Sequence, residues 1–412
     1  MKSLICISLA LSLALTAPVE AATKHAAPAE KKSATRKAER AAEAAPAAFA
    51  AGTGLAGVTP PVLAARSWLL LDTGSNQELA SLKPDERAEP ASLTKLMTAY
   101  VVFGALRAKT IKLDQQVPVS ENAWRMVKSG SAMFIEPRKP LTVDEALHGV
   151  IIQSGNDACV ALAELVAGSE QNFVTLMNRE AVRLGLTNTQ FKNATGLTEE
   201  GHYSTPRDMA KIAAAIIRDY PEYFPIYSQK EFTYNNIKQP NRNGLLLIDP
   251  TVDGMKTGHT DAAGYCLVAT AHRDQRRLIS VVMGTSSMRV REQESQKLLS
   301  FGFFAYDTTR FFASGQPMRS LKVWQGKTDS VPVGFTRDVT ITLPKDRSKD
   351  VKLQFESRQP LKAPLPFGTA VGTVRLTLDG QSLGDFPVVT LEEVVQANWF
   401  GRMWDAIRLW FQ

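Results

Sequence analysis

The stretch PASLTKLMTAY, residues 90–100, decides how the rest of the chain is interpreted. Pro90 followed by an apolar run predicts a helix that starts close to Ser92. Residues three apart share a helix face, so the amine of Lys95 can reach the Ser92 hydroxyl. A hydroxyl becomes a nucleophile when a base removes its proton, and a desolvated lysine with a lowered pKa can be that base. The alternative is an N-capping serine with a surface lysine, since Ser-x-x-Lys arises about once by chance in a chain of this length.

A second motif, Ser154-Gly155-Asn156, follows the apolar segment LHGVIIQ and precedes another apolar helical pattern. A polar loop between two apolar helices is expected to project into an interior cleft. Another Ser-x-Asn, formed by Ser120 and Asn122, opens the segment ENAWRM and is interpreted as an ordinary helix cap. The copy at residue 154 is therefore the candidate for chemistry.

The third motif is Lys256-Thr257-Gly258, which leads into a strand-like run through His259. This tripeptide is expected only about 0.1 times by chance at average composition. The three motifs together, in this order, are a strong signal.

Ser-x-x-Lys, Ser-x-Asn and Lys-Thr-Gly in this order resemble the signature of serine penicillin-recognising enzymes, which include class A β-lactamases. The segments PASLTKLMTAY, VIIQSGNDACVALAE, LGLTNTQF, QPNRNGLL and VDGMKTGHTDAAGYCLVATA look more like low-molecular-mass D-alanyl-D-alanine carboxypeptidases. The resemblance runs from about residue 66 to the end of the chain. It implies removal of the terminal D-alanine from peptidoglycan stem peptides through an acyl-enzyme, covalent inhibition by β-lactams, and no metal or other cofactor.

The resemblance also implies a role for each motif residue. It makes Ser92 the acylated nucleophile, Lys95 its base and Ser154 a proton relay. The substrate-binding residues that it implies are Asn156, Lys256, Thr257, Gly258, His259 and Arg291. The backbone N–H groups of Ser92 and His259 would form the oxyanion hole. Arg291 would bind the terminal carboxylate, which needs a charged donor, and its alternative is a surface helix residue.

Three other functions are weighed against this one. A β-lactamase would share the motifs, but class A enzymes deacylate with an acidic residue on a loop, and the chain has no equivalent motif. A catalytically silent wall-binding module is at odds with three intact motifs. A zinc carboxypeptidase would need paired ligand spacing, which is absent from the histidines that follow the N-terminal segment, His148, His202, His259 and His272.

The N-terminal part of the 412 residues is predicted to hold an export signal and a tether. Residues 1–21 start with Lys2 and continue with an apolar run of about a dozen residues, well short of the roughly 20 that span a bilayer. Small residues permit cleavage after Ala21. Residues 22–64 are rich in Ala, Lys, Glu and Pro and are predicted to be a flexible tether.

Hydrophobic periodicity divides the remainder into a catalytic domain, residues 65–307, and a β-rich domain, residues 308–394. In the first, helical patterns cover residues 93–107, 143–152, 157–167, 171–184 and 206–217, and strand patterns cover residues 67–72, 265–271 and 278–283. Helices combined with a sheet predict an α/β (α+β) fold. In the second, short alternating runs at residues 339–343, 351–355, 372–378 and 386–391 predict strands.

Residues 395–412 are predicted to form an amphipathic helix. Its apolar face collects Trp399, Phe400, Met403, Trp404, Ile407, Trp410 and Phe411. Aromatic residues flanked by arginines are typical of a helix lying in a membrane interface. The alternative is a helix packed on its own domain or on a second copy. The expected location is the periplasm, at the outer face of the inner membrane.

Charge and cysteine content are less informative. The formal net charge of +7 suits an anionic wall polymer or anionic lipid, and the chain lacks the clustered basic face that nucleic acid requires. Cys6 leaves with the signal segment. Cys159 and Cys266 remain, and either one disulfide or two buried thiols fits their apolar contexts.

Overall fold

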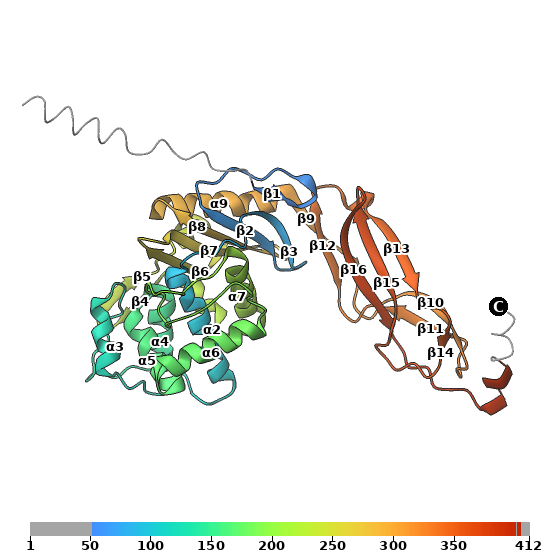
Figure 1. Ribbon diagram of the computed structural model, residues 1–412, viewed down its shortest axis with the longest axis horizontal. Helices are drawn as coiled ribbons and strands as arrows, with labels where there is room; N and C mark the ends of the chain where they lie inside the picture. The colour runs from blue at the N-terminus through green and yellow to red at the C-terminus, as the bar shows by residue number, and fades with distance from the viewer. Residues whose placement is uncertain (1–51, 401, 405–412) are drawn as a thin grey trace, which may run out of the picture. The chain divides into compact units, whose positions relative to one another are not determined.

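The computed structural model describes residues 52–400 and 402–404 (Figure 1). The predicted signal segment and half of the predicted terminal helix lie outside the described residues. The described chain contains a first folded region, residues 53–305, and a second, residues 306–396.

One antiparallel sheet organises the first region, with the strand order β1-β3-β2-β8-β7-β6. Its strands are β1 (Thr53–Gly54), β2 (Ser67–Asp72), β3 (Gln77–Leu82), β6 (Val252–Thr260), β7 (Gly264–Arg273) and β8 (Arg276–Thr285). The third motif lies in β6, at one end of this order. Among the described residues, β6 therefore has one free edge.

Side-chain alternation explains why helices cover both faces of this sheet. Leu69 and Val268 pack into the larger core, together with the group of helices between residues 95 and 219, called here the helical cluster. Leu70 and Leu267 pack into a smaller core on the other face. Figure 1 shows α9 (Met288–Ala305) on the face opposite the helical cluster. The remaining helices and strands of this region are α2 (Lys95–Arg107), α3 (Glu121–Arg125), α4 (Val143–His148), α5 (Asn156–Ala167), α6 (Glu170–Arg183), α7 (Pro206–Asp219), α8 (Leu245–Ile248), β4 (Glu231–Tyr234) and β5 (Ile237–Pro240).

Side-chain caps fix the start of several helices close to the predicted positions. Thr142 forms a capping box with Glu145 at α4, and Ser169 and Thr205 cap α6 and α7. Ser120 accepts a hydrogen bond from the N–H of Ala123, which confirms its interpretation as a cap.

The predicted helix over residues 143–152 differs from the structure in its second half. The α-helix ends at His148, and a π-helical turn, Gly149–Gln153, follows. A β-carbon on Gly149 would overlap the side chain of Met133, so this turn depends on glycine. The turn ends at Ser154, whose φ of 68° reverses the chain into α5.

The tether prediction is wrong for residues 53–63. Thr53 and Gly54 pair with Ser81 and Ala80 of β3, and Leu63 is fully buried in the smaller core. The Ala-rich and Pro-rich composition conceals a few large apolar side chains, and burial of these is enough to fix the segment onto the sheet.

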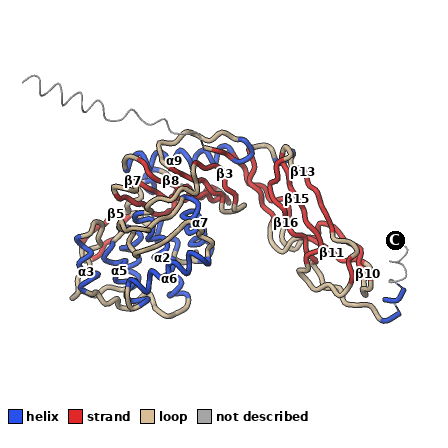
Figure 2. The backbone as a smooth tube through the Cα atoms, viewed as in Figure 1, coloured by secondary structure: helices blue, strands red, loops and turns tan. Residues whose placement is uncertain are grey.

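The second region consists almost entirely of strands and loops (Figure 2). Its strands are β9 (Tyr306–Phe312), β10 (Pro317–Trp324), β11 (Ser330–Gly334), β12 (Val339–Pro344), β13 (Lys352–Ser357), β14 (Leu361–Lys362), β15 (Ala370–Leu378) and β16 (Gln381–Thr390). Six of them form a sheet in the order β13-β15-β16-β11-β10-β14, and β12 pairs with β9. The four predicted strands correspond to β12, β13, β15 and β16.

The start of the predicted terminal helix is described, and its apolar side chains face solvent. The exposed fractions are 59% for Trp399, 70% for Phe400, 46% for Met403 and 58% for Trp404. Among the described residues, no helix combines the length and hydropathy that crossing a bilayer requires.

Candidate active site

The three motifs meet at one cleft of about 510 Å³. Ser92 comes from the 3-10 turn Ala91–Thr94 that precedes α2, and Ser154 and Asn156 come from the start of α5. Thr257 and Gly258 come from the edge strand β6. Segments far apart in the sequence thus place the hydroxyls of Ser92 and Ser154 and the amide of Asn156 around one cavity.

Lys95 is positioned to act on Ser92. Its Nζ lies 2.9 Å from Ser92 Oγ and donates hydrogen bonds to Asn156 Oδ1 at 2.7 Å and to the carbonyl oxygen of Thr195 at 2.6 Å. Burial lowers the pKa of Lys95, which is 1% exposed. A neutral amine has two hydrogens, which the two carbonyl-type oxygens accept, so its lone pair faces the Ser92 hydroxyl.

Lys256 is a second buried amine in the same site. Its Nζ donates to Ser154 Oγ at 2.9 Å and to the carbonyl oxygen of Thr257 at 3.0 Å. Burial is the main cause that holds the pKa of Lys256 well below its usual value, and the positive charge of Lys95 adds to it. The Ser154 hydroxyl is thereby bonded to a group that can hold or release a proton.

Asn156 and its neighbour Asp157 fix the loop opposite β6. Asn156 donates from Nδ2 to the carbonyl oxygen of Ser129 at 2.9 Å, and its backbone N–H donates to that of Ser131 at 2.8 Å. Ser129 and Ser131 line the cleft, yet sequence reasoning missed them. No motif marks them, because they enter the site only through these contacts with the second motif.

Gly258 allows the edge strand to pack directly on the turn that carries Ser92. A β-carbon there would lie 3.0 Å from the carbonyl oxygen of Pro90 and 3.2 Å from the backbone nitrogen of Leu93. A larger residue would push β6 away from Ser92. The glycine of the third motif therefore sets the width of the cleft.

His259 and Arg291 also line the cleft. The His259 ring packs against Tyr265 with a centroid distance of 4.0 Å. Arg291, from α9, is only 4% exposed, so its alternative interpretation as a surface residue is wrong. It donates to the carbonyl oxygen of Arg242 at 3.3 Å, its Nε has no hydrogen-bond partner among the described residues, and burial lowers its pKa.

Sequence reasoning missed Arg242, which lines the cleft, and Glu89, which supports the cleft through hydrogen bonds. Arg242 lines the cleft from QPNRNGLL, a segment with no assigned role. Glu89 accepts hydrogen bonds from the hydroxyls of Thr198 at 2.9 Å and Thr260 at 3.0 Å, which joins two walls of the cleft. The sequence signal that could have identified Glu89 is its position three residues before Ser92.

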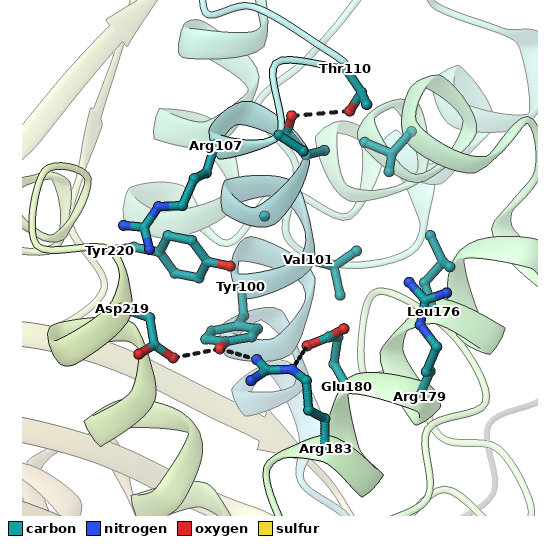
Figure 3. Close-up of a pocket in the computed structure, with 14 residues that line it drawn as sticks. Tyr100, Val101, Arg107, Thr110, Leu176, Arg179, Glu180, Arg183, Asp219 and Tyr220 are labelled. Carbon is teal, nitrogen blue, oxygen red and sulfur yellow. Dashed lines mark hydrogen bonds and ion pairs between the residues drawn. The ribbon is translucent and has the colours of Figure 1, made fainter. Parts of the chain in front are cut away.

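A second cavity of about 580 Å³ lies beside the C-terminal half of α2 (Figure 3). The Tyr100 hydroxyl donates to Asp219 at 2.6 Å and accepts from Arg183. Arg107 pairs with Glu222 at 3.0 Å. The lining contains no lysine or histidine, and most of its charged side chains are already in ion pairs, so this cavity is part of the scaffold rather than a reaction site.

Cys159 and Cys266 are buried free thiols, which decides between the two alternatives left by the sequence. Burial raises the pKa of Cys159 to about 12 and also raises the pKa of Cys266. They act as small apolar residues in the core.

Two family models match the chain. The model described as D-alanyl-D-alanine carboxypeptidase, peptidase S11, matches residues 55–287, and the one described as the C-terminal domain of penicillin-binding protein 5 matches residues 306–396. The second match starts at the first residue of β9, and α9 lies between the two matches.

Curated relatives and solved structures match over nearly the whole described chain. The chain is 44% identical to the D-alanyl-D-alanine carboxypeptidase DacC of Escherichia coli K12 over 373 residues, which covers 89% of this chain and 92% of the relative. It is 45% identical to DacA of Haemophilus influenzae over 354 residues, or 85% and 90% of the two chains. Penicillin-binding protein 5 from Haemophilus influenzae superposes with a TM-score of 0.80 and 44% identity, covering 82% of this chain and all of that structure.

Proposed function

Because the chain belongs to the peptidase S11 family of D-alanyl-D-alanine carboxypeptidases, we propose that Ser92 is the nucleophile with which it removes the terminal D-alanine of peptidoglycan stem peptides. The observation that carries this assignment is the 2.9 Å distance from Ser92 Oγ to the buried amine of Lys95. The β-lactamase alternative has no support from the relatives, which are named as carboxypeptidases.

Acylation begins when neutral Lys95 takes the proton of the Ser92 hydroxyl. The oxygen then attacks the carbonyl carbon of the penultimate D-alanine, and the carbonyl π electrons move onto its oxygen. The backbone N–H groups of Ser92 and His259 stabilise that oxyanion. Hydrogen bonds to Asn156 and Thr195 hold the Lys95 amine with its lone pair toward the hydroxyl.

The leaving amine needs a proton when the peptide bond breaks. Ser154 supplies it and takes up the proton that Lys95 removed from Ser92, so Lys95 is neutral again, and Lys256 holds the Ser154 hydroxyl through a 2.9 Å hydrogen bond. The intermediate collapses to an ester on Ser92, and D-alanine departs. A water molecule then attacks the ester with Lys95 as base, which regenerates the hydroxyl.

The substrate lies along the free edge of β6. Thr257, Gly258 and His259 belong to this edge, and a peptide can add to it by backbone hydrogen bonds. Asn156 contributes its amide, and Lys256 adds positive potential. Arg291 offers its unpartnered Nε to the terminal carboxylate.

β-Lactams are proposed to acylate the same serine. A solved relative, penicillin-binding protein D2 from Listeria monocytogenes, is described in an ampicillin-bound form. In this chain a β-lactam carbonyl would occupy the position of the penultimate D-alanine carbonyl. The ring-opened product stays attached through carbon, so no leaving group departs to make room for water.

We also propose that the protein acts in the periplasm, at the outer face of the inner membrane. Residues 1–21 have the pattern of an export signal. Trp399, Phe400 and Trp404 are exposed, as expected for aromatic residues that enter a lipid interface.

Mass spectrometry of a penicillin adduct tests the assignment of the nucleophile. The intact β-lactam mass is expected on the tryptic peptide that contains Ser92. Lys95→Gln should slow adduct formation at least about a hundredfold, as for loss of a general base. Lys112→Gln, at an exposed lysine, is the matched control. An adduct on another residue, or equal rates in both variants, would refute the assignment.

A further inference from the structure

A small apolar hollow of about 500 Å³ lies on the outer side of the loop that forms one wall of the cleft. It is lined by Trp124, Val127, Phe134, Ile135, Glu136, Pro137 and Arg138. Trp124 is 47% exposed and Phe134 is 41% exposed, so two aromatic rings face solvent here. Its volume falls within the range of small-ligand sites, about 300–1,000 Å³.

The chain holds Phe134 in this exposed position at a conformational cost. Its φ is 67°, in the left-handed region that bulky residues rarely adopt. The carboxylate of Asp157 accepts hydrogen bonds from the backbone N–H groups of Met133, Phe134 and Ile135 at 3.0, 2.8 and 3.1 Å. A strained, exposed aromatic residue fixed by a buried carboxylate indicates a functional surface.

The hollow is continuous with the reactive cleft through one short segment. Ser129 and Ser131 line the cleft, whereas Val127 and Phe134 line the hollow. Asn156 and Asp157 anchor the two sides of this segment. Phe134 follows Ser131 by three positions, so their Cα atoms are at most about 11 Å apart.

The rim of the hollow carries groups that bond hydroxyls. The Glu136 carboxylate accepts hydrogen bonds from Lys139 at 2.7 Å and from Asn235 at 3.2 Å, and it keeps further acceptor capacity. The Arg138 guanidinium has no hydrogen bond or ion pair among the described residues and is exposed. Aromatic rings above a polar rim match a pyranose ring, which has an apolar C–H face and a hydroxyl edge.

We propose that this hollow, formed around Trp124 and Phe134, binds a sugar ring of the glycan strand to which the stem peptide is attached. The inference rests on the proposed function, because it places the rest of the same substrate. Three residues precede the penultimate D-alanine in a pentapeptide stem and span roughly 10 Å when extended. That length is comparable with the upper limit of about 11 Å between Ser131 in the cleft wall and Phe134 in the hollow.

The small size of the hollow argues against a protein partner. A specific protein interface buries about 800 Å² on each side and involves some 20–30 residues. The hollow is formed by seven residues, with charged side chains at its edge. One or two sugar rings fill such a site, whereas a folded partner would leave most of its interface unsupported.

Glycan binding can be separated from catalysis by comparing two substrates that have the same scissile bond, one with sugars and one without. D-Alanine release is measured from uncross-linked glycan strands that carry pentapeptides and from diacetyl-L-Lys-D-Ala-D-Ala, which has no sugar. Trp124→Ala and Phe134→Gly remove the rings, and glycine accepts the positive φ of residue 134. Phe304→Ala, at a residue 79% exposed on α9, is the matched control.

Each ring variant should lose about tenfold in kcat/KM on the strands, the loss expected when a central aromatic contact of a binding site is removed. The same variants should stay within about twofold of the unmodified protein on the tripeptide. Equal losses on both substrates, or no loss on either, would overturn the proposal.

Binding of peptide-free glycan strands gives an independent measurement. Such strands should quench tryptophan fluorescence of the unmodified protein and compete with pentapeptide strands, and Trp124→Ala should abolish the quenching. Quenching only by strands that carry peptide would assign the hollow to the stem peptide and overturn the proposal. An unmodified protein inactive on the tripeptide would instead refute the proposed function, and the fluorescence result would still decide on glycan binding.

Discussion

The Nζ of Lys95 lies 2.7 Å from Oδ1 of Asn156, so the first and second motifs share a hydrogen bond inside the protein. Asn156 gives its Nδ2 to the carbonyl oxygen of Ser129, which fixes the orientation of its amide. An uncharged acceptor at this position lets the buried amine remain neutral. A carboxylate there would favour the charged ammonium form.

The rate of β-lactam acylation is expected to rise with pH through the lowered pKa of Lys95, because only the neutral amine accepts the Ser92 proton. Asn156→Asp should raise that pKa, shift the profile to higher pH and slow acylation at neutral pH. Asn156→Ala, which adds no charge, should not shift it upward. Stopped-flow rates with a fluorescent penicillin between about pH 5 and 10 give these profiles. A wild-type rate that rises only near pH 10, where an ordinary lysine titrates, would contradict the mechanism.

Tyr100→Phe should destabilise the first folded region by about 1–2 kcal/mol, because it leaves Asp219 and Arg183 without a buried hydroxyl partner (Figure 3). Urea unfolding followed by circular dichroism measures the change. Tyr223→Phe is the control, since that hydroxyl has no hydrogen bond among the described residues, and its effect should stay below about 0.5 kcal/mol. Equal effects of the two substitutions would show that the Tyr100 hydroxyl adds nothing specific.

Cys159 and Cys266 should not react with a thiol reagent in the native protein. Both are buried, and a pKa of about 12 leaves almost no thiolate on Cys159 at neutral pH. Protein lacking residues 1–21, unfolded without reductant, should release two equivalents from Ellman's reagent. Two equivalents that appear only after reduction would indicate a disulfide instead.

Substitution of both Trp399 and Trp404 by alanine should weaken sedimentation with anionic lipid vesicles about tenfold, since each exposed indole contributes apolar area to an interfacial helix. Phe367→Ala, at a residue 61% exposed in the second folded region, should leave binding unchanged. Vesicle binding that survives removal of residues 398–412 would place the contact elsewhere.

The part of the site that could be predicted is the part encoded by local spacing. Ser92 and Lys95 are one helical turn apart, so their contact follows from the sequence alone. The contact between Lys256 and Ser154 joins residues 102 positions apart, and only the resemblance placed them together. Arg242 and Ser129 could not be found, because tertiary contacts rather than motifs bring them to the cleft.

The fold was predictable where hydrophobic period and caps agree, as at α6 and α7. The prediction failed where a single tertiary contact, rather than the local amino-acid composition, determines the backbone. The π-helical turn after His148 depends on the fit of Gly149 against Met133, which no periodicity encodes. Residues 53–63 look like a tether by composition, yet burial of Leu63 and pairing with β3 fix them in place.

Release of free D-alanine from diacetyl-L-Lys-D-Ala-D-Ala tests the central claim most directly. Protein without the terminal helix should release D-alanine steadily and form a long-lived penicillin adduct, and Ser92→Ala should do neither while unfolding at the same urea concentration. Undiminished D-alanine release by Ser92→Ala, or rapid clearance of the adduct by an unmodified protein that releases no D-alanine, would contradict the account.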